Sequence, residues 1–498
     1  MLVAITAPLP AVAQQDPDRS VVTQIRSSVG GKYKDFYRTR GYWPLWIQDG
    51  RLGTAADKLI DMVAHADLDG LDPSDYDPDR LREAVAEARN GTPKDMARAE
   101  IMLSKTLVDY VRDMRRNPGA EMVYLDKELE PERPSEIAVL REAGVAPSFA
   151  DYVGNMGWMN PIYAGLRAGL AAYREDWADL PAIEIPGGDM LRPGAQGDRV
   201  ALLRERLGLP EGGKFDKAVA GRVRAFQTAH GLDADGIVGD ATLAALNRNP
   251  RLYEDMILLN LDRARVLPGS RGRYIVVDAA AARLWMYDKG EVQDTMRVIV
   301  GKPTEPTPMM VGMMRYVTLN PYWNVPEDLV RNRIAPKIVK TRASLDAMGY
   351  EALSDWTANA SLLDPATIDW PAVAAGERAL RVRQLPGKDN AMGRIKFMFP
   401  NNLGVYLHDT PDKDLFRKPV RRFSSGCVRL EDARRLEVWL FGKPVEASSA
   451  DPEQAMWLPQ PMPVYITYFT AAPTDNGIAF RNDPYGRDGE KLDQLAGR

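Results

Sequence analysis

The sequence predicts a multidomain α+β protein in which helical domains precede a mostly β domain. Three observations predict this class. The chain has 498 residues, enough for roughly three domains of about 150 residues each. Apolar residues keep a helical spacing up to about residue 272, whereas short β-branched and aromatic runs follow one another from residue 273. A hydrophobic content of 45% and a charged content of 27% are those of ordinary folded protein.

The first thirteen residues are apolar and uncharged, and Ala11-Val12-Ala13 fits the small-x-small cleavage pattern of a secretory signal. The positive region that normally opens such a signal is missing, and a floppy apolar terminus is the alternative. We expect residues 1–13 to be the remnant of an export signal. No apolar run reaches the 18 or so residues that span a bilayer, so we expect an exported protein without a transmembrane segment.

Residues 20–185 are expected to form a helical scaffold domain. Apolar positions from Met96 through Leu103, Leu107 and Val111 recur at spacings of three and four, which is typical of an amphipathic helix. The aromatic stretches at 36–46 are expected to pack in a core. His65 has no cysteine or second histidine near it in the sequence, so this region shows no catalytic constellation.

Residues 190–248 form a compact module with three short helical stretches, and residues 249–272 are expected to form a connecting helix. Asp198 and Asp216 stand at predicted helix starts, where a carboxylate can accept hydrogen bonds from first-turn amides. Residues 197–200 and 226–239 resemble the helical peptidoglycan-binding module. A protein-docking surface is the alternative, since glycan contact does not follow from the residues.

Residues 273–470 are expected to form the mostly β domain. Between residues 325 and 390 the composition changes to charged helical turns, over a length too great for a plain connection. We expect this insert to be a capping or lid segment, with a packing subdomain as the alternative. Residues 471–498 are expected to be a C-terminal tail. The strand candidates are 274–277, 284–287, 296–300, 315–319, 394–399, 405–408 and 464–469.

The chain contains one cysteine, Cys427, which follows Gly426 in a Ser/Gly turn and lies nineteen residues after His408. A lone cysteine cannot form an intramolecular disulfide, and an exported chain has reason to avoid a free thiol. Its retention beside an upstream histidine indicates a thiol nucleophile with its base. A buried cysteine acting as a small hydrophobic side chain is the alternative.

Residues 417–430 carry five cations and no acid. Neighbouring positive charge favours a thiolate and attracts substrates that bear carboxylates. Arg429 is the cation expected to contact such a carboxylate. A helix predicted to begin at Glu431-Asp432 is expected to present its positive end near the nucleophile.

Tyr406-Leu407-His408-Asp409-Thr410-Pro411, Phe416 and residues 422–429 together resemble the signature of the L,D-transpeptidase (YkuD-type) family. Residues 321–326 and 386–397 are similar to its large YcbB-like branch, which also has a scaffold, a peptidoglycan-binding module and a capping insert. The resemblance covers nearly the whole chain. The wider family often has a histidine two residues before the cysteine; Ser425 stands there in this sequence, which leaves His408 as the sole candidate base.

The resemblance implies a transferase of cell-wall synthesis. Cys427 would attack the third residue of a stem tetrapeptide and release D-alanine, with His408 as base and the amides near Ser425 and Gly426 holding the oxyanion. A 3→3 cross-link between diaminopimelate residues would follow, and carbapenems would acylate Cys427. The residues expected to bind substrate are Arg429, Tyr406, Trp323, Asn324, Ser424 and Arg422.

The expected partners are peptidoglycan stem peptides and glycan, with an outer-membrane protein as an alternative acceptor, and the expected location is periplasmic and wall-associated. A net charge of −4 gives no sign of nucleic-acid binding. No metal and no cofactor are expected, because His65, His230 and His408 are scattered without metal-ligand spacing. A hydrolase using the same site and a non-catalytic wall-binding scaffold are the other interpretations.

Overall fold

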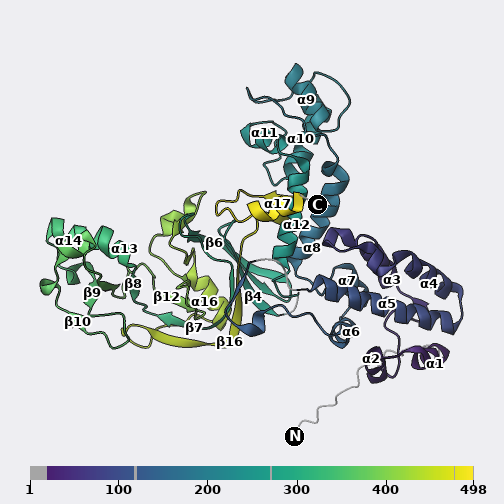
Figure 1. Cartoon of the computed structure of the whole chain (residues 1–498), viewed down its shortest axis with the longest axis horizontal. Coiled ribbons are helices and arrows are strands. Elements are labelled where there is room, and N and C mark those ends of the chain that lie inside the picture. Colours follow the sequence, from purple (N-terminus) through teal and green to yellow (C-terminus); the bar gives the residue numbers. More distant parts are fainter. Residues whose placement is uncertain (1–18, 117–120, 270–271, 476, 497–498) are drawn as a thin grey trace, which may run out of the picture.

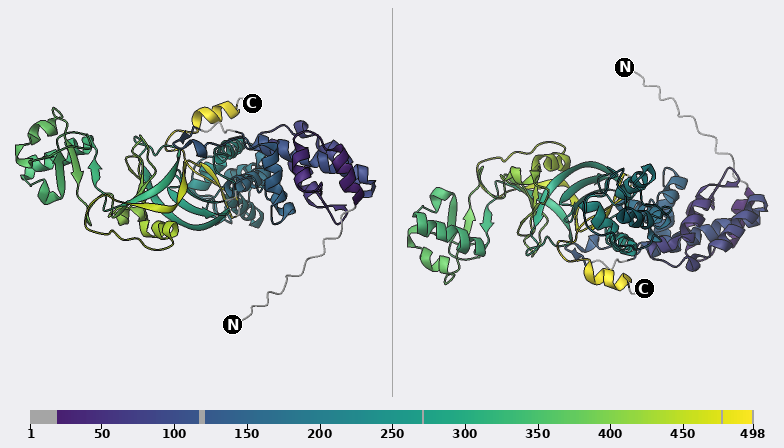
Figure 2. Two further views of the ribbon diagram at one scale, coloured as in Figure 1. Left: turned by 90° about the horizontal axis from the view of Figure 1, so that it is seen from below. Right: turned by 90° about the horizontal axis from the view of Figure 1, so that it is seen from above.

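The computed structural model describes residues 19–116, 121–269, 272–475 and 477–496. The predicted signal remnant, residues 1–13, lies outside these residues. The molecule is elongated, with the helical N-terminal domain at one end, a curved β domain in the middle and the inserted segment at the other end, while a small helical module projects from the side (Figures 1 and 2). Within the described part of the chain, no helix combines the length and the apolar character needed to cross a bilayer.

The N-terminal domain is helical and packs around its longest helix, α5. Thr92 and Asp95 form a reciprocal capping box at the start of α5, which satisfies amides that the helix itself leaves unpaired. The aromatic side chains of Tyr37 and Trp46 are buried against this helix. The elements are α1 (Arg19–Ser28), α2 (Tyr33–Thr39), β1 (Ile47–Gln48), β2 (Arg51–Leu52), α3 (Ala55–Ala64), α4 (Pro78–Asn90), α5 (Pro93–Met114), β3 (Val123–Tyr124), α6 (Glu136–Gly144), α7 (Phe149–Gly154) and α8 (Pro161–Tyr173).

The side module consists of α9 (Asp198–Arg206), α10 (Lys217–Ala229) and α11 (Asp240–Leu246), and α12 (Pro250–Ala264) connects it to the β domain. Asp216 caps α10, because its carboxylate accepts a hydrogen bond of 3.0 Å from the Val219 amide. Asp198 is instead the first residue of α9, with Gly197 at the cap position. His230, directly after α10, is buried in a cluster of aromatic rings.

The β domain is a sheet that closes on itself. The strands follow the order β12-β13-β15-β6-β5-β4-β16-β7, and β12 also pairs with β7. The enclosed face is apolar, and Val317, Phe397, Leu407 and Val428 are fully buried there. The strands are β4 (Arg273–Asp278), β5 (Arg283–Asp288), β6 (Glu291–Gly301), β7 (Met310–Leu319), β12 (Ile395–Met398), β13 (Leu407–His408), β15 (Val428–Leu430) and β16 (Gln454–Thr467).

Two further strands join this sheet from outside its ring. β3, which belongs to the helical N-terminal domain, pairs parallel with β7. β14 (Arg422–Ser424) pairs parallel with β6 and leads into the turn that carries Cys427. The scaffold and the β domain therefore share main-chain hydrogen bonds as well as side-chain packing.

The insert is a small domain with its own sheet, in the order β10-β9-β11-β8, and its own apolar core. The sequence pattern indicated only helical turns, because each of these strands is two to four residues long, too short to show a period of two. Its elements are β8 (Trp323–Val325), α13 (Glu327–Leu329), α14 (Ala335–Thr341), β9 (Tyr350–Leu353), β10 (Leu362–Leu363), α15 (Trp370–Ala375) and β11 (Arg381–Gln384).

The C-terminal segment, which the sequence suggested to be a tail, folds back onto the helices. β17 (Ala471–Thr474) and β18 (Gly477–Phe480) form a hairpin, and α17 (Gly489–Ala496) lies beside α12 (Figure 1). A buried ion pair of 2.7 Å between Arg263 of α12 and Asp488 fixes the start of α17. This contact joins residues 225 positions apart in the chain, so no local pattern could have revealed it.

Candidate active site

Strand register brings the predicted nucleophile and base to one face of the sheet. β13 and β15 are parallel, with Leu407 opposite Val428 and His408 opposite Arg429. Because side chains alternate along a strand, Leu407 and Val428 point into the core, whereas His408 and Arg429 point outward. Cys427 directly precedes Val428 and therefore lies on the outward face with His408.

These side chains line one cavity of about 360 Å³. Its walls come from the outward face of the sheet, the turn before β15 and the beginning of the insert. Of the predicted site residues, Cys427, His408, Ser424, Ser425, Tyr406, Arg429, Trp323 and Asn324 line it. Arg422 and Gly426 are not among the lining residues. The cavity also includes residues that the sequence did not single out, namely Tyr322, Pro326, Leu329, Ala391, Met392, Lys396 and Gly404.

The Cys427–Val428 peptide group is held by hydrogen bonds on both of its sides. The Ser424 hydroxyl donates to the Cys427 carbonyl oxygen over 2.5 Å, and the Val428 amide donates to the Tyr406 carbonyl oxygen over 2.9 Å. Gly426 has a φ of 106°, a left-handed conformation that side chains with a Cβ rarely adopt. The turn thus needs glycine at position 426 for its backbone conformation. Ser424 stabilises the turn through its hydroxyl.

The thiol is protonated in this arrangement. Cys427 Sγ donates a hydrogen bond of 3.3 Å to the Gly404 carbonyl oxygen, which requires the proton to be on sulfur. Burial raises the pKa of the Cys427 thiol, while a hydrogen bond with the main chain of Tyr406, and then the charges of Lys396 and Arg429, act in the opposite direction. Burial outweighs the two cations because an anion loses its hydration in the cavity.

The basic segment contributes less to the thiol than its sequence suggested. Arg417 is exposed and pairs with Asp414 at 3.3 Å. Arg421 donates to main-chain carbonyl oxygens, including that of Ala282. Among these five cations only Arg429 acts on the pKa of the thiol, and it lowers that pKa. The other cation that lowers it is Lys396, which lies outside this segment on β12.

His408 is a neutral imidazole with a defined tautomer. Its Nδ1 lies 2.5 Å from the Asp409 carbonyl oxygen; because a carbonyl only accepts, Nδ1 carries the proton and Nε2 is left as an acceptor. Burial, and then the charge of Arg429, lowers the pKa of His408 to about 3. At neutral pH this side chain is therefore unprotonated, which is the state a base needs, while a pKa this low makes the imidazole a weak base in the unliganded site.

The helix after Cys427 does not supply positive charge to the thiol, which differs from the prediction. α16 (Ala433–Phe441) is separated from Cys427 by the whole of β15, a distance of about 10 Å at 3.3 Å per residue. The Asp432 carboxylate also caps this helix by accepting a hydrogen bond from the Arg435 amide. A dipole effect falls off within the first turn, so α16 stabilises the domain rather than the thiolate.

Lys396 is the functional candidate that the sequence analysis missed. It lies opposite His408 in the β12–β13 pair, and its Nζ is 3.8 Å from the centre of the Tyr406 ring. Burial lowers the pKa of Lys396, and no carboxylate of the described residues forms an ion pair with it, whereas Arg429 pairs with Asp412 at 3.3 Å. The local signal was the alternation of Lys396 with the apolar Ile395 and Phe397, which predicts an outward-facing lysine but does not show that it lies opposite His408.

Comparison with known families matches three consecutive parts of the chain. Residues 31–170 match a scaffold domain, residues 200–246 match a family described as "Putative peptidoglycan binding domain", and residues 272–446 match the YkuD family, described as an L,D-transpeptidase catalytic domain. The third range includes both His408 and Cys427. The chain contains an L,D-transpeptidase catalytic domain. The residues predicted as nucleophile and base both lie in this YkuD domain.

A Haemophilus influenzae protein named "Putative L,D-transpeptidase" is 31% identical over 239 residues, which are 47% of this chain and 48% of that protein. The alignment thus spans about half of the relative's length. Solved L,D-transpeptidases from Xylanimonas cellulosilytica and Stackebrandtia nassauensis are 18% and 14% identical. They cover 56% and 58% of this chain and 98% and 97% of their own, with TM-scores of 0.17 and 0.19. TM-scores of this size do not support a structural argument, so the assignment rests on the match to the family.

Proposed function

We propose that the protein is a cysteine-dependent L,D-transpeptidase that acts on peptidoglycan stem peptides at the cell wall. The observation that carries this proposal is the pairing, in one cavity of a YkuD domain, of a neutral thiol with a neutral imidazole whose Nε2 can accept a proton. The matches to an L,D-transpeptidase domain and a peptidoglycan-binding domain support the choice of substrate.

The acyl transfer begins from the neutral pair. The thiol leaves its hydrogen bond to Gly404, His408 Nε2 takes its proton, and Cys427 Sγ forms a bond with the carbonyl carbon of the donor stem. The amide of Cys427 stabilises the oxyanion of the tetrahedral intermediate. The carbon–nitrogen bond to the terminal D-alanine then breaks, and His408 returns the proton to the leaving amine.

In the second half of the reaction, an amine of a second stem attacks the thioester carbonyl and displaces Cys427. His408 takes a proton from the attacking amine, the carbon–sulfur bond breaks, and His408 passes this proton to the sulfur, so that Cys427 recovers its thiol. When the acceptor is the side-chain amine of diaminopimelate, the product is a 3→3 cross-link. Water in the place of the amine yields a tripeptide instead.

The cations of the cavity suit this substrate class. Stem peptides carry free carboxylates near the bond that breaks. Lys396 offers an ammonium group that forms no direct ion pair among the described residues, while the charge of Glu453 acts on it from further away. Binding a carboxylate there replaces lost hydration with an ion pair. Arg429 is held by Asp412 at the same cavity and is the second cation available to an anionic substrate.

The beginning of the insert contributes one wall of the cavity. Trp323 and Asn324 of β8, with Pro326 and Leu329 after them, line it. We propose that this wall limits the access of water to the thioester and so favours amine acceptors. The body of the insert lies at the far end of the molecule (Figure 2), so its first turn rather than its full length is the part placed to act on acceptor choice.

The test is incubation of the protein with a disaccharide-tetrapeptide, followed by mass analysis of the products. Cross-linked dimer and released D-alanine are expected. Tripeptide alone would make the protein a hydrolase, and unchanged substrate would refute catalysis. Cys427→Ala is the matched control, since it removes the only thiol of the chain; dimer formation by this variant would refute the mechanism.

A further inference from the structure

Thr307 connects the loop between β6 and β7 to the turn that carries the nucleophile. Its side chain is fully buried. The hydroxyl donates a hydrogen bond of 2.8 Å to the Gly426 carbonyl oxygen and accepts one of 2.8 Å from the Gly301 amide. The loop is tightly folded, since a Cβ on Gly301 would stand 2.1 Å from the Glu305 carbonyl oxygen. The hydroxyl therefore has a fixed position against the turn.

This hydrogen bond sets the direction of the Cys427 amide. Gly426 and Cys427 share one peptide group, and in a planar trans peptide the carbonyl and the amide point in opposite directions. The Gly426 carbonyl points to Thr307, which is not among the residues lining the cavity. The Cys427 amide consequently points away from Thr307, and no acceptor in the described part of the chain takes its hydrogen.

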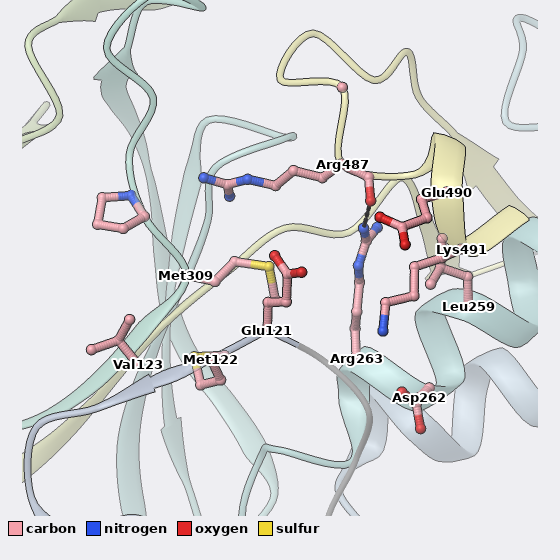
Figure 3. A pocket seen from close by; sticks show the side chains of 12 residues that line it. Glu121, Met122, Val123, Leu259, Asp262, Arg263, Met309, Arg487, Glu490 and Lys491 are labelled. Atoms are coloured by element: carbon pink, nitrogen blue, oxygen red, sulfur yellow. Dashed lines mark hydrogen bonds between the residues drawn. The ribbon is translucent and has the colours of Figure 1, made fainter.

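The C-terminal segment also donates hydrogen bonds to the same loop. The Tyr485 hydroxyl donates to the Gly301 carbonyl oxygen over 2.6 Å, and Arg487 Nη2 donates to the Thr307 carbonyl oxygen over 2.8 Å. Figure 3 shows Arg487 beside a cavity of about 500 Å³: its main-chain oxygen accepts from Arg263 of α12, and its guanidinium extends away from that helix. A series of hydrogen bonds thus connects Arg263 of α12, through Arg487 and Thr307, to the turn that carries Cys427.

We propose that Thr307 is a positioning residue for acyl transfer: its hydroxyl holds the Gly426–Cys427 peptide so that the Cys427 amide is preorganised to stabilise the oxyanion. This inference rests on the proposed role of Cys427 as an acyl-accepting nucleophile, and it does not depend on peptidoglycan as the donor. Preorganised donors stabilise the transition state because they need no reorientation during the reaction.

The experiment compares two reactions of the same thiol in the full-length protein. Transfer of acetyl from p-nitrophenyl acetate forms a sulfur–carbon bond, passes through a tetrahedral oxyanion and expels p-nitrophenolate. Alkylation by iodoacetamide displaces iodide at a saturated carbon and forms no oxyanion. Thr307→Val, which removes the hydroxyl at nearly constant volume, should slow acetyl transfer by about 10–10²-fold and leave alkylation within about twofold. Thr307→Ser should restore acetyl transfer.

Three outcomes would overturn the inference. They are unchanged acetyl transfer in Thr307→Val, an equal loss in both reactions, and failure of Thr307→Ser to recover. If Thr307→Val does not fold, Tyr485→Phe replaces it, since it removes a hydroxyl that holds Gly301 and also contacts Thr307. The same selective loss is expected, and its absence would count against the inference. A wild-type protein that is acetylated but produces no cross-link or tripeptide would refute the proposed function alone.

Discussion

His230 and His408 are alike in nearly every property that is used to find a catalytic histidine. Their exposed fractions are 2% and 4%. Burial lowers the pKa of each to about 3. Each holds its Nδ1 proton against a main-chain carbonyl oxygen, that of Phe226 at 2.7 Å and that of Asp409 at 2.5 Å. Burial and a perturbed pKa therefore do not distinguish the two side chains.

The difference lies in what surrounds the rest of each ring. The Nε2 of His230 is buried and has no hydrogen-bond partner among the described residues. His408 faces a cavity shared with a thiol and two cations. The aromatic rings that pack around His230 are Phe226, Tyr173, Trp177, Tyr253 and Phe480. A perturbed histidine thus indicates catalysis only where its second nitrogen opens onto other reactive groups.

The largest expected effect is a difference in the rate of D-alanine release between variants of the two histidines. His408→Gln should slow release of D-alanine from the tetrapeptide donor by about 10²–10⁴-fold, the usual scale for loss of a general base. His230→Gln, made at a side chain of similar burial, should leave this rate within about twofold. Single-turnover acylation followed by intact-protein mass is the measurement. Equal losses in the two variants would remove the distinction.

The protonation state of the pair provides the second test. Because burial raises the pKa of the Cys427 thiol above its ordinary value of 9.0, the thiolate fraction should rise about tenfold per pH unit. Iodoacetamide alkylation should therefore accelerate about 100-fold between pH 7 and pH 9 without reaching a plateau. A plateau below pH 7 would show a thiolate–imidazolium pair, and His408 would then not be the neutral base described above.

Lys396 gives the third test, because His408 shares its cavity with this cation and with the thiol. Lys396→Met should raise the KM for the tetrapeptide donor about 10–10²-fold, since a hydrogen bond to a charged group contributes roughly 1.5–3 kcal/mol. Lys396→Arg should retain most of the affinity. A donor with amidated carboxylates is the control: an equal loss of affinity for it in Lys396→Met would show that the ammonium does not bind a carboxylate.

The smallest effect concerns acid stability and leaves catalysis untouched. Between pH 6.5 and about 3 the unfolded chain protonates a histidine that the folded protein keeps neutral, so stability falls as the pH is lowered. His230→Phe cannot bind this proton. Its loss of unfolding free energy from pH 7.5 to pH 5 should be smaller than that of the wild type by about 2 kcal/mol. Urea unfolding at both pH values measures it, and an identical loss would contradict the neutral state of His230.

The sequence was sufficient for the overall class, and it singled out two residues that the structure places in one cavity. Helical spacing along α5 and the β-branched runs of β4 to β7 are local signals, and the structure confirms the mixed helical and β architecture. Cys427 and His408 stood out because a single cysteine is rare in a chain of this length and the residues around both fit a known signature. The four short strands of the insert left no such signal, because periodicity cannot be detected over two to four residues.

The sequence by itself determined which residue types are available to the site: one thiol, one nearby histidine, and a turn that needs glycine. Only the tertiary structure decided how they act. Strand register placed Lys396 across from His408, burial rather than the basic segment set the state of the thiol, and a loop 119 residues before Gly426 supplied the hydroxyl that holds it. Each of these depends on contacts between residues distant in the chain, and such contacts leave no periodic trace in the sequence around either partner.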